Sequence, residues 1–260
     1  MRGVNSDKDG EEMKKQLGDL GNFEKKGSLK DFFNREASRY QQFIKGRDFV
    51  TFLKEKVNSH LTGRVLDVGS GRISDFEDGS FNYYVAMDIS LAMLQGLKPK
   101  GRIELVCGDA RALPFREGAF DLLIYRSVLH HLNPNGMPKD EMERSLKELL
   151  IEARRVVKRD GKVLVIEPCF PPFLETVEHI LTPLIRWVMR LLGLPYVFLF
   201  SYRRLTVLLK KGGWDSLRVT HIKGTGKSRE WITPVLGLPH VKIPRGLSPS
   251  KVYLIEGSKE

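Results

Sequence analysis

The sequence predicts an α/β fold: a doubly wound, mostly parallel sheet of seven strands with helices on both faces. Short runs of almost entirely apolar residues alternate with segments of helical periodicity. Continuous apolar runs of this kind are typical of strands that are covered on both faces. The chain has 260 residues and 41% apolar content, which is enough for one domain with additions. We therefore expect a single domain over residues 28–260.

Two helices are expected before the first strand. Apolar residues recur at three- and four-residue steps from Ser28 onward, and again over residues 48–61, where Gly63 ends the second helix. Residues 1–27 are charged and lack apolar periodicity. They are expected to form a mobile polar leader without an assigned function.

The first strand runs directly into the glycine turn Gly69-Ser70-Gly71. Such a turn, when it opens a helix, presents free N–H groups and the positive end of the helix dipole, and it favours an anionic or strongly polar ligand. A helix is also expected over residues 141–157. The seven strands are expected at residues 65–68, 83–87, 103–107, 120–125, 162–166, 217–222 and 252–256.

Polar side chains follow several of these strands, where an open parallel sheet binds its ligands. They are Asp67, Asp88, Asp109, Arg126 and Ser127. Asp88 lies nineteen residues after Gly69, a position from which a carboxylate can accept both hydroxyl protons of a ribose. Asp109, one strand further out, can reach the exocyclic amino group of a purine. A dinucleotide fingerprint needs Gly or Ala where this chain has Ser74, so NAD is disfavoured.

These segments resemble the class I S-adenosylmethionine-dependent methyltransferases, and the resemblance covers about residues 28–170. The motifs that carry it are VLDVGSG, AMDIS, GDARALPF, FDLLIYRSVLHHL and RRVVKRDGKVLVIEP. Phe33, Ala37 and Tyr40 also resemble the leader helix of the ubiquinone- and menaquinone-biosynthesis branch. The resemblance implies a Rossmann-like sheet with an antiparallel last strand, a helical insertion after strand five, and S-adenosyl-L-methionine as cofactor.

The resemblance also implies a set of cofactor-binding residues. They are Tyr40, Asp67, Gly69, Ser70, Gly71, Arg72, Asp88, Ile89, Asp109, Ala110, Arg126 and Ser127. In the family pattern, Asp88 holds the ribose and Asp109 the adenine. The chain departs from the pattern at Ile73, which replaces the third motif glycine, while Arg72 beside it can pair with the cofactor carboxylate.

Methyl transfer from a sulfonium requires a close, in-line approach in a dry pocket. Where the accepting atom carries a proton, a base must remove it, and His130 and His131 are the candidates because they follow strand four. No N/D-P-P-Y/F/W sequence follows that strand, as would be expected of an amino-methyltransferase acting on flipped bases or glutamine. A small or lipid-like acceptor is therefore favoured over nucleic acid, and no metal site is predicted.

Residues 171–212 are expected to form a helical insertion that covers the substrate. Its apolar stripe consists of Ile180, Leu184, Trp187, Val188 and Leu191. Arg186 and Arg190 interrupt the apolar run, so the segment is not expected to span a membrane. It fits an interfacial helix or a lid over an apolar substrate, and an extra core helix packed on the sheet is the alternative. A long loop over residues 223–250 is expected to join the last two strands.

The net charge is +11, of which +8 lies in residues 171–260. This excess suits nucleic acid, anionic lipid or an acidic substrate, so peripheral contact with an anionic membrane is a further candidate. Two cysteines and a polar N-terminal segment predict a cytoplasmic, disulfide-free protein. Two alternative functions remain: an RNA methyltransferase, and a non-catalytic methyltransferase-like protein that binds a membrane or a partner.

Overall fold

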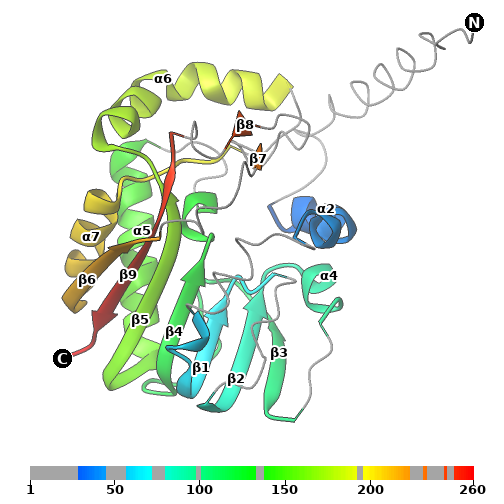
Figure 1. Cartoon of the computed structure of the whole chain (residues 1–260), viewed down its shortest axis with the longest axis vertical. Helices are drawn as coiled ribbons and strands as arrows, with labels where there is room; N and C mark the ends of the chain where they lie inside the picture. The colour runs from blue at the N-terminus through cyan, green and yellow to red at the C-terminus, as the bar shows by residue number, and fades with distance from the viewer. Residues whose placement is uncertain are drawn as a thin grey trace, which may run out of the picture.

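A computed structural model describes residues 29–44, 57–71, 80–97, 101–132, 138–191, 196–222 and 249–260. For residues 38–44 and residue 80 only the backbone is described, and the same holds for residues 231–232 and 243–244. Its centre is a seven-stranded sheet of order β3-β2-β1-β4-β5-β9-β6 (Figure 1). The strands are β1 (Thr62–Val68), β2 (Ser80–Asp88), β3 (Ile103–Cys107), β4 (Phe120–Arg126), β5 (Val157–Cys169), β6 (Asp215–His221) and β9 (Lys251–Ser258). All seven expected strands are confirmed.

The first five strands are parallel, and β9 lies antiparallel between β5 and β6. This confirms the mostly parallel sheet with an antiparallel last strand. Strand β1 pairs with β2 on one side and with β4 on the other. The strand order therefore reverses at β1, and in an open α/β sheet a ligand binds beyond the carboxyl ends of the strands at such a point.

Successive strand residues are buried on opposite faces of the sheet. Leu66, Val85 and Leu123 belong to the cluster that includes the buried residues of α5 (Lys139–Val156) and α7 (Tyr202–Lys211). Their neighbours Val65, Tyr84 and Leu122 belong to a second cluster, which includes Leu94 of α4 (Leu91–Leu94) and Val57 and Leu61 before β1. Burial on both faces explains why the strands are continuous apolar runs.

The helices agree with the sequence where the structure describes them. The first expected helix is α2 (Leu29–Ile44), and the helix expected at 141–157 is α5, which begins at Lys139. The leader at 1–27, most of the helix expected at 48–61 and the segment after Gly71 lie outside the described residues. In the connection at 223–250, the described residues form two short paired strands, β7 (Trp231–Ile232) and β8 (Ile243–Pro244).

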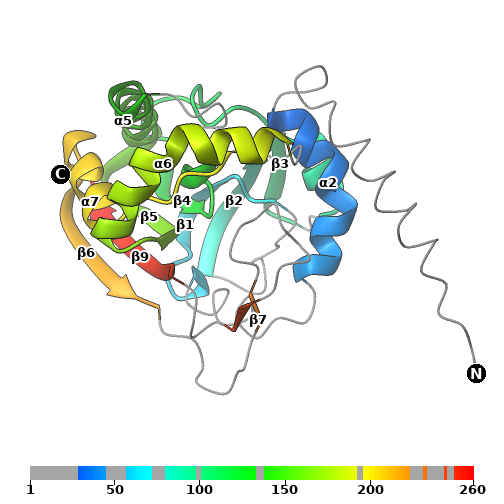
Figure 2. The same ribbon diagram turned by 90° about the horizontal axis from the view of Figure 1, so that it is seen from above.

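The insertion after β5 consists of α6 (Pro172–Leu191), an extended segment at 196–200, and α7. Figures 1 and 2 show α6 above the edge where the parallel strands end, on the side of β5 and α5, with α2 on the side of β2 and α4. Tyr196, Phe198 and Phe200 are buried in the core, whereas the apolar stripe of α6 faces outward. The stripe is therefore not a core element. No helix among the described residues is long and apolar enough to cross a membrane.

Candidate functional site

The glycine turn after β1 brings the backbone close to the neighbouring loops. Gly69 and Gly71 have φ angles of +69° and +57°, which favour glycine. The N–H groups of Gly69 and Ser70 both donate to the carbonyl of Met87, at 2.7 and 3.0 Å. A Cβ atom on Gly69 would lie 2.3 Å from Cγ2 of Val128, so a larger residue does not fit there.

Asp88, at the end of β2, is oriented by two backbone N–H groups. Gly71 donates to its Oδ2 at 2.9 Å and Ser90 to its Oδ1 at 2.8 Å. Burial raises the pKa of Asp88, whereas these hydrogen bonds act in the opposite direction. A carboxylate accepts about four hydrogen bonds in total, so Asp88 retains acceptor capacity beside the glycine turn. This position fits the ribose-binding role expected from the sequence.

Asp67, near the end of β1, is fully buried and accepts two side-chain hydrogen bonds. Tyr84 Oη and Arg126 Nη2 donate to its Oδ2 at 2.8 and 3.1 Å. Burial raises the pKa of Asp67, and Arg126 and Tyr84 oppose this effect. Asp67 Oδ1 and Ser70 Oγ are buried and have no hydrogen-bond partner among the described residues. Buried acceptors without a partner are groups that a bound polar ligand satisfies.

Asp109 follows β3 in a more exposed position. It accepts hydrogen bonds from the backbone N–H of Arg111 at 2.9 Å and from its guanidinium at 2.6 Å, and this pairing lowers the pKa of Asp109. An adenine-binding role would therefore require Asp109 to share its carboxylate with Arg111. Ile89 and Ala110 are the chain neighbours of Asp88 and Asp109 and are partly buried.

Of the remaining predicted cofactor residues, the structure describes the side chain of Ser127. Ser127 follows Arg126 with a φ angle of +55°, unusual for a residue with a side chain, and its N–H donates to Ile166. Arg72, Ile73 and the side chain of Tyr40 lie outside the described part of the chain, so their expected roles stay predictions.

Glu167, at the end of β5, holds the loop that carries the two histidines. Its Oε1 accepts the backbone N–H groups of Val128 and Leu129 at 2.6 and 2.7 Å, and its Oε2 lies 2.6 Å from His130 Nδ1. Sequence reasoning did not single out Glu167. The available signal was its place in RRVVKRDGKVLVIEP, an acid at the carboxyl end of a strand like Asp67 and Asp88.

The rings of His130 and His131 are in contact, but the two rings have different partners. Their ring centroids lie 4.1 Å apart, and the ring of His131 also meets Phe33 of α2 edge-on at 5.1 Å. The surrounding protein and the neighbouring His130 lower the pKa of His131 well below its usual value. With His130 Nδ1–H donating to Glu167, the lone pair lies on Nε2, which is buried and has no partner among the described residues.

Helix α2 links the two halves of this edge. Its Asn34 Oδ1 accepts a hydrogen bond from Ser90 Oγ at 2.6 Å, while its Phe33 contacts His131. Followed from residue to residue, these contacts return to the glycine turn, and we call this set of residues the site ring. Its members are Gly69, Gly71, Asp88, Ser90, Asn34, Phe33, His131, His130, Glu167 and Val128. The structure thus brings Gly69, Gly71, Asp88 and both histidines together, whereas Asp109 is paired with Arg111 and makes none of these contacts among the described residues.

Part of the chain is similar in sequence to known proteins. Residues 66–165 match the family model described as a methyltransferase domain. The chain is 38% identical over 117 residues to demethylmenaquinone methyltransferase from Renibacterium salmoninarum, an alignment that covers 42% of this chain and 44% of that protein. The first curated relatives that it matches are covered over about half of their length, from 43% to 60%.

Solved structures share the fold. YcgJ from Bacillus subtilis superposes with a TM-score of 0.54 at 17% identity and covers 80% of this chain and 97% of its own. Phosphoethanolamine N-methyltransferase 2 from Haemonchus contortus, in complex with S-adenosyl-L-methionine, has a TM-score of 0.61 at 15% identity and covers 90% and 60%. Together, the match over residues 66–165 and these fold similarities show that the chain contains a methyltransferase domain on a Rossmann-like sheet.

Proposed function

We propose that this chain transfers a methyl group from S-adenosylmethionine to a small-molecule or lipid-like acceptor. The observation that carries the proposal is the site ring, which joins the glycine turn and Asp88 to a histidine pair at one edge of the sheet. The similarity to a demethylmenaquinone methyltransferase supports an acceptor of this class. When bound, the cofactor supplies an electrophilic methyl group on a sulfonium.

The residues present fit this cofactor. Gly69 leaves no room for a side chain, and the unpartnered Asp67 Oδ1 and Ser70 Oγ are buried acceptors on either side of it in the sequence. We assign the ribose hydroxyls to Asp88, because its two oxygens are already oriented by backbone N–H groups. A preorganised carboxylate loses little conformational freedom on binding.

We assign proton removal from the acceptor to His130 Nε2. Glu167 accepts the Nδ1–H and fixes both the ring orientation and the tautomer, and its negative charge stabilises the imidazolium that forms when Nε2 takes a proton. Glu167 is a positioning residue in this scheme. The lowered pKa keeps His131 neutral at physiological pH, so it adds no positive charge beside His130.

Cofactor binding is tested by isothermal titration calorimetry with S-adenosylmethionine and its demethylated product. We expect micromolar affinity, weakened at least about tenfold by Asp88→Ala because the ribose acceptor is lost. Asp121→Asn is the matched control, since Asp121 is an acid of β4 that pairs with Lys158 and Arg64 away from the site ring. Absence of heat with both compounds would contradict the proposal.

The base is tested by tritium transfer from labelled cofactor to a panel of quinols, phenols and lipid-like alcohols. With any acceptor found, we expect His130→Gln to lower kcat by about 10²–10⁴-fold while leaving the cofactor Kd unchanged. Glu167→Gln should lower kcat less and shift its pH profile. His179→Gln, in α6, is the control. An unchanged kcat in His130→Gln would remove the histidine from the mechanism.

RNA is the second candidate acceptor, because +8 of the net charge lies in residues 171–260. An RNA methyltransferase should bind RNA with an affinity that falls steeply as salt rises. Fluorescence anisotropy at low salt decides this point, and no binding there would exclude RNA as acceptor.

A further inference from the structure

Helix α6 presents apolar side chains to solvent along its whole length. We call these eight side chains the α6 apolar face. They are Phe173, Val177, Ile180, Leu181, Leu184, Trp187, Val188 and Leu191. Ile180 is 71% exposed, Phe173 67% and Trp187 58%. The face recurs at three- and four-residue steps, so it is one continuous stripe on a helix about 30 Å long.

The opposite side of α6 carries polar groups that are fixed to the protein by hydrogen bonds, beside the buried Met189. Glu178, which is buried, accepts the backbone N–H of Leu199 at 3.2 Å. Glu175 accepts the N–H of Ser201 at 3.0 Å, and Thr182 Oγ1 lies 3.2 Å from Tyr196 Oη. Rolling the helix to bury its apolar face would break these contacts and leave buried polar groups unsatisfied. The outward orientation is therefore built into the fold.

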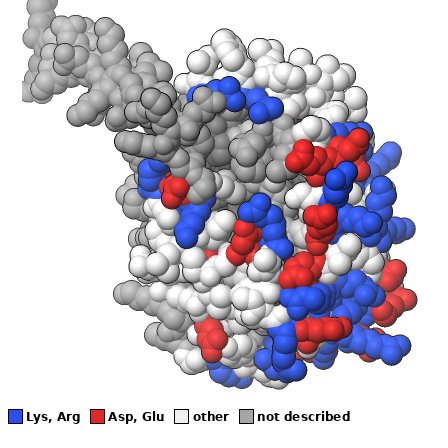
Figure 3. Space-filling view, turned by 180° about the vertical axis from the view of Figure 1, so that it is seen from behind, with Lys and Arg blue, Asp and Glu red and all other residues white. Residues whose placement is uncertain are grey.

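Basic groups lie along one flank of this face. At about 100° per residue, Arg186 and Arg190 fall on the same flank as Thr176 and His179. In the space-filling view, the surface over α6 is almost uncharged, and both basic and acidic groups lie along its border (Figure 3). The charged residues of α6 are Glu175, Glu178, Arg186 and Arg190, and none of them belongs to the apolar face.

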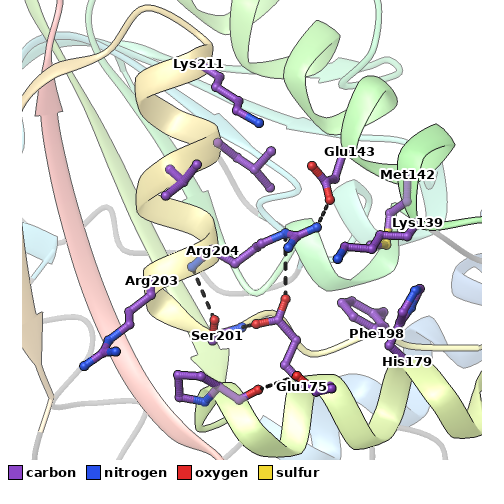
Figure 4. Close-up of a pocket in the computed structure, with 14 residues that line it drawn as sticks. Lys139, Met142, Glu143, Glu175, His179, Phe198, Ser201, Arg203, Arg204 and Lys211 are labelled. Carbon is purple, nitrogen blue, oxygen red and sulfur yellow. Dashed lines mark hydrogen bonds and ion pairs between the residues drawn. The ribbon is translucent and has the colours of Figure 1, made fainter.

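The same flank opens onto a cavity of about 400 Å³ between α5, α6 and α7, lined by Thr176 and His179 among others (Figure 4). Arg204 lies between Glu143 and Glu175 and forms ion pairs with both. Lys139 and Lys211 also point into the cavity. Because both lining glutamates are already held by Arg204, the remaining cationic groups of the lining are Lys139, Lys211 and Arg203.

We infer that the α6 apolar face, with this basic flank, docks onto the surface of a bilayer that contains anionic phospholipid. A helix of this kind lies in the interface plane, with its apolar side chains in the acyl boundary and its basic groups among the headgroups. Trp187 suits that boundary because its ring is both apolar and able to donate a hydrogen bond. The inference goes beyond the proposed methyl transfer and does not depend on it.

Charge favours a membrane over a second copy of the chain. The net charge of +11 opposes association between two copies and favours an anionic surface. Each Lys or Arg near such a surface adds to the attraction, and the effect is lost at high salt.

The experiment is co-flotation of the full chain, without cofactor, with vesicles of phosphatidylcholine alone or with about one third phosphatidylglycerol. We expect at least about tenfold stronger partition onto the anionic vesicles. The double variant Ile180→Gln with Leu184→Gln should lower it at least about tenfold, because two side chains no longer enter the acyl boundary. Lys139→Glu with Lys211→Glu should remove most of the preference for anionic lipid.

The matched control is Ile151→Gln with Val219→Gln, two exposed apolar residues on α5 and β6, and it should partition like the parent chain. All substituted side chains are exposed, and circular dichroism checks that each variant is folded. Equal partition of the Ile180/Leu184 variant and the parent would overturn the inference, as would no binding to either vesicle. A dimer in light scattering that this variant dissociates, without vesicle binding, would assign the face to a second copy instead.

Discussion

Helices α5 and α6 are of similar length, 18 and 20 residues, and both are amphipathic. Helix α5 buries its apolar face, whereas α6 exposes its apolar face to solvent. The buried residues of α5 are Met142, Leu146, Leu149, Leu150, Ala153 and Val156. Those of α6 are Glu178 and Met189. An amphipathic pattern therefore establishes two faces of a helix, whereas the surface opposite the helix determines which face is buried.

The two surfaces differ in what they offer. Helix α5 packs on the apolar core formed by the sheet, so burial of its leucines is favourable. Helix α6 lies against the segment at 196–201, where the backbone N–H groups of Leu199 and Ser201 need acceptors from outside the sheet. Glu175 and Glu178 supply those acceptors, so the polar face turns inward.

The largest effect that tests this comparison is truncation of one leucine on each helix. Leu146→Ala should lower the free energy of unfolding by about 2–5 kcal/mol, because it leaves a cavity in the core. Leu184→Ala, on the exposed face, should change it by less than about 0.5 kcal/mol. Urea unfolding of both variants measures the difference. Equal losses would show that the face of α6 is buried in solution.

A smaller effect concerns the pH dependence of stability. Burial raises the pKa of Glu178 from 4.5 to about 8, so the folded state keeps this proton where the unfolded state has lost it. The free energy of unfolding should therefore fall as pH rises between these values, by about 1.4 kcal/mol per pH unit from this group. Glu178→Gln should remove that slope in urea unfolding at pH 6, 7 and 8.

The control for this slope is Glu148→Gln on the exposed side of α5, which should leave the pH dependence as in the parent chain. If Glu178→Gln keeps the full slope, the inward carboxyl of α6 is ionised in the folded state and its polar face is more hydrated than the structure shows.

The smallest effect separates an inward from an outward threonine of α6. Thr182 Oγ1 contacts the carbonyl of Glu178 at 2.9 Å and Tyr196 Oη at 3.2 Å, whereas the exposed Thr176 contacts only a carbonyl of its own helix, that of Pro172, among the described residues. Thr182→Val should lower the unfolding free energy by about 1 kcal/mol. Thr176→Val should change it by less than about 0.5 kcal/mol. Thermal unfolding of the pair suffices, and the reverse order would contradict the assigned orientation.

Much of the fold followed from local sequence. Most strand positions could be predicted because β1, β2, β4 and β5 are buried on both faces, and the acids at the ends of β1 and β2 because a parallel sheet collects them at one edge. Glu167 carried the same signal and was missed, and Asn34 carried no such signal; the roles of both depend on contacts with loops distant in sequence. The interfacial or lid-like helix favoured within residues 171–212 agrees with the exposed apolar side chains of α6, whereas the contacts of Glu175 and Glu178 that fix its orientation could not be predicted, for the same reason.

The position of β9 constrains the order in which the chain can assemble. Strand β6 pairs with β9 and with no other strand of the described sheet, and β9 is made from residues 251–258, after every other element. During synthesis, β6 and the open edge of β5 must therefore wait for these residues before the sheet can close. Lys259 then joins the end of α5 through the carbonyls of Arg154 and Val157. A chain without residues 251–258 would leave β5 and β6 without the strand that pairs with both, and unpaired strand edges are the kind of surface on which aggregation begins.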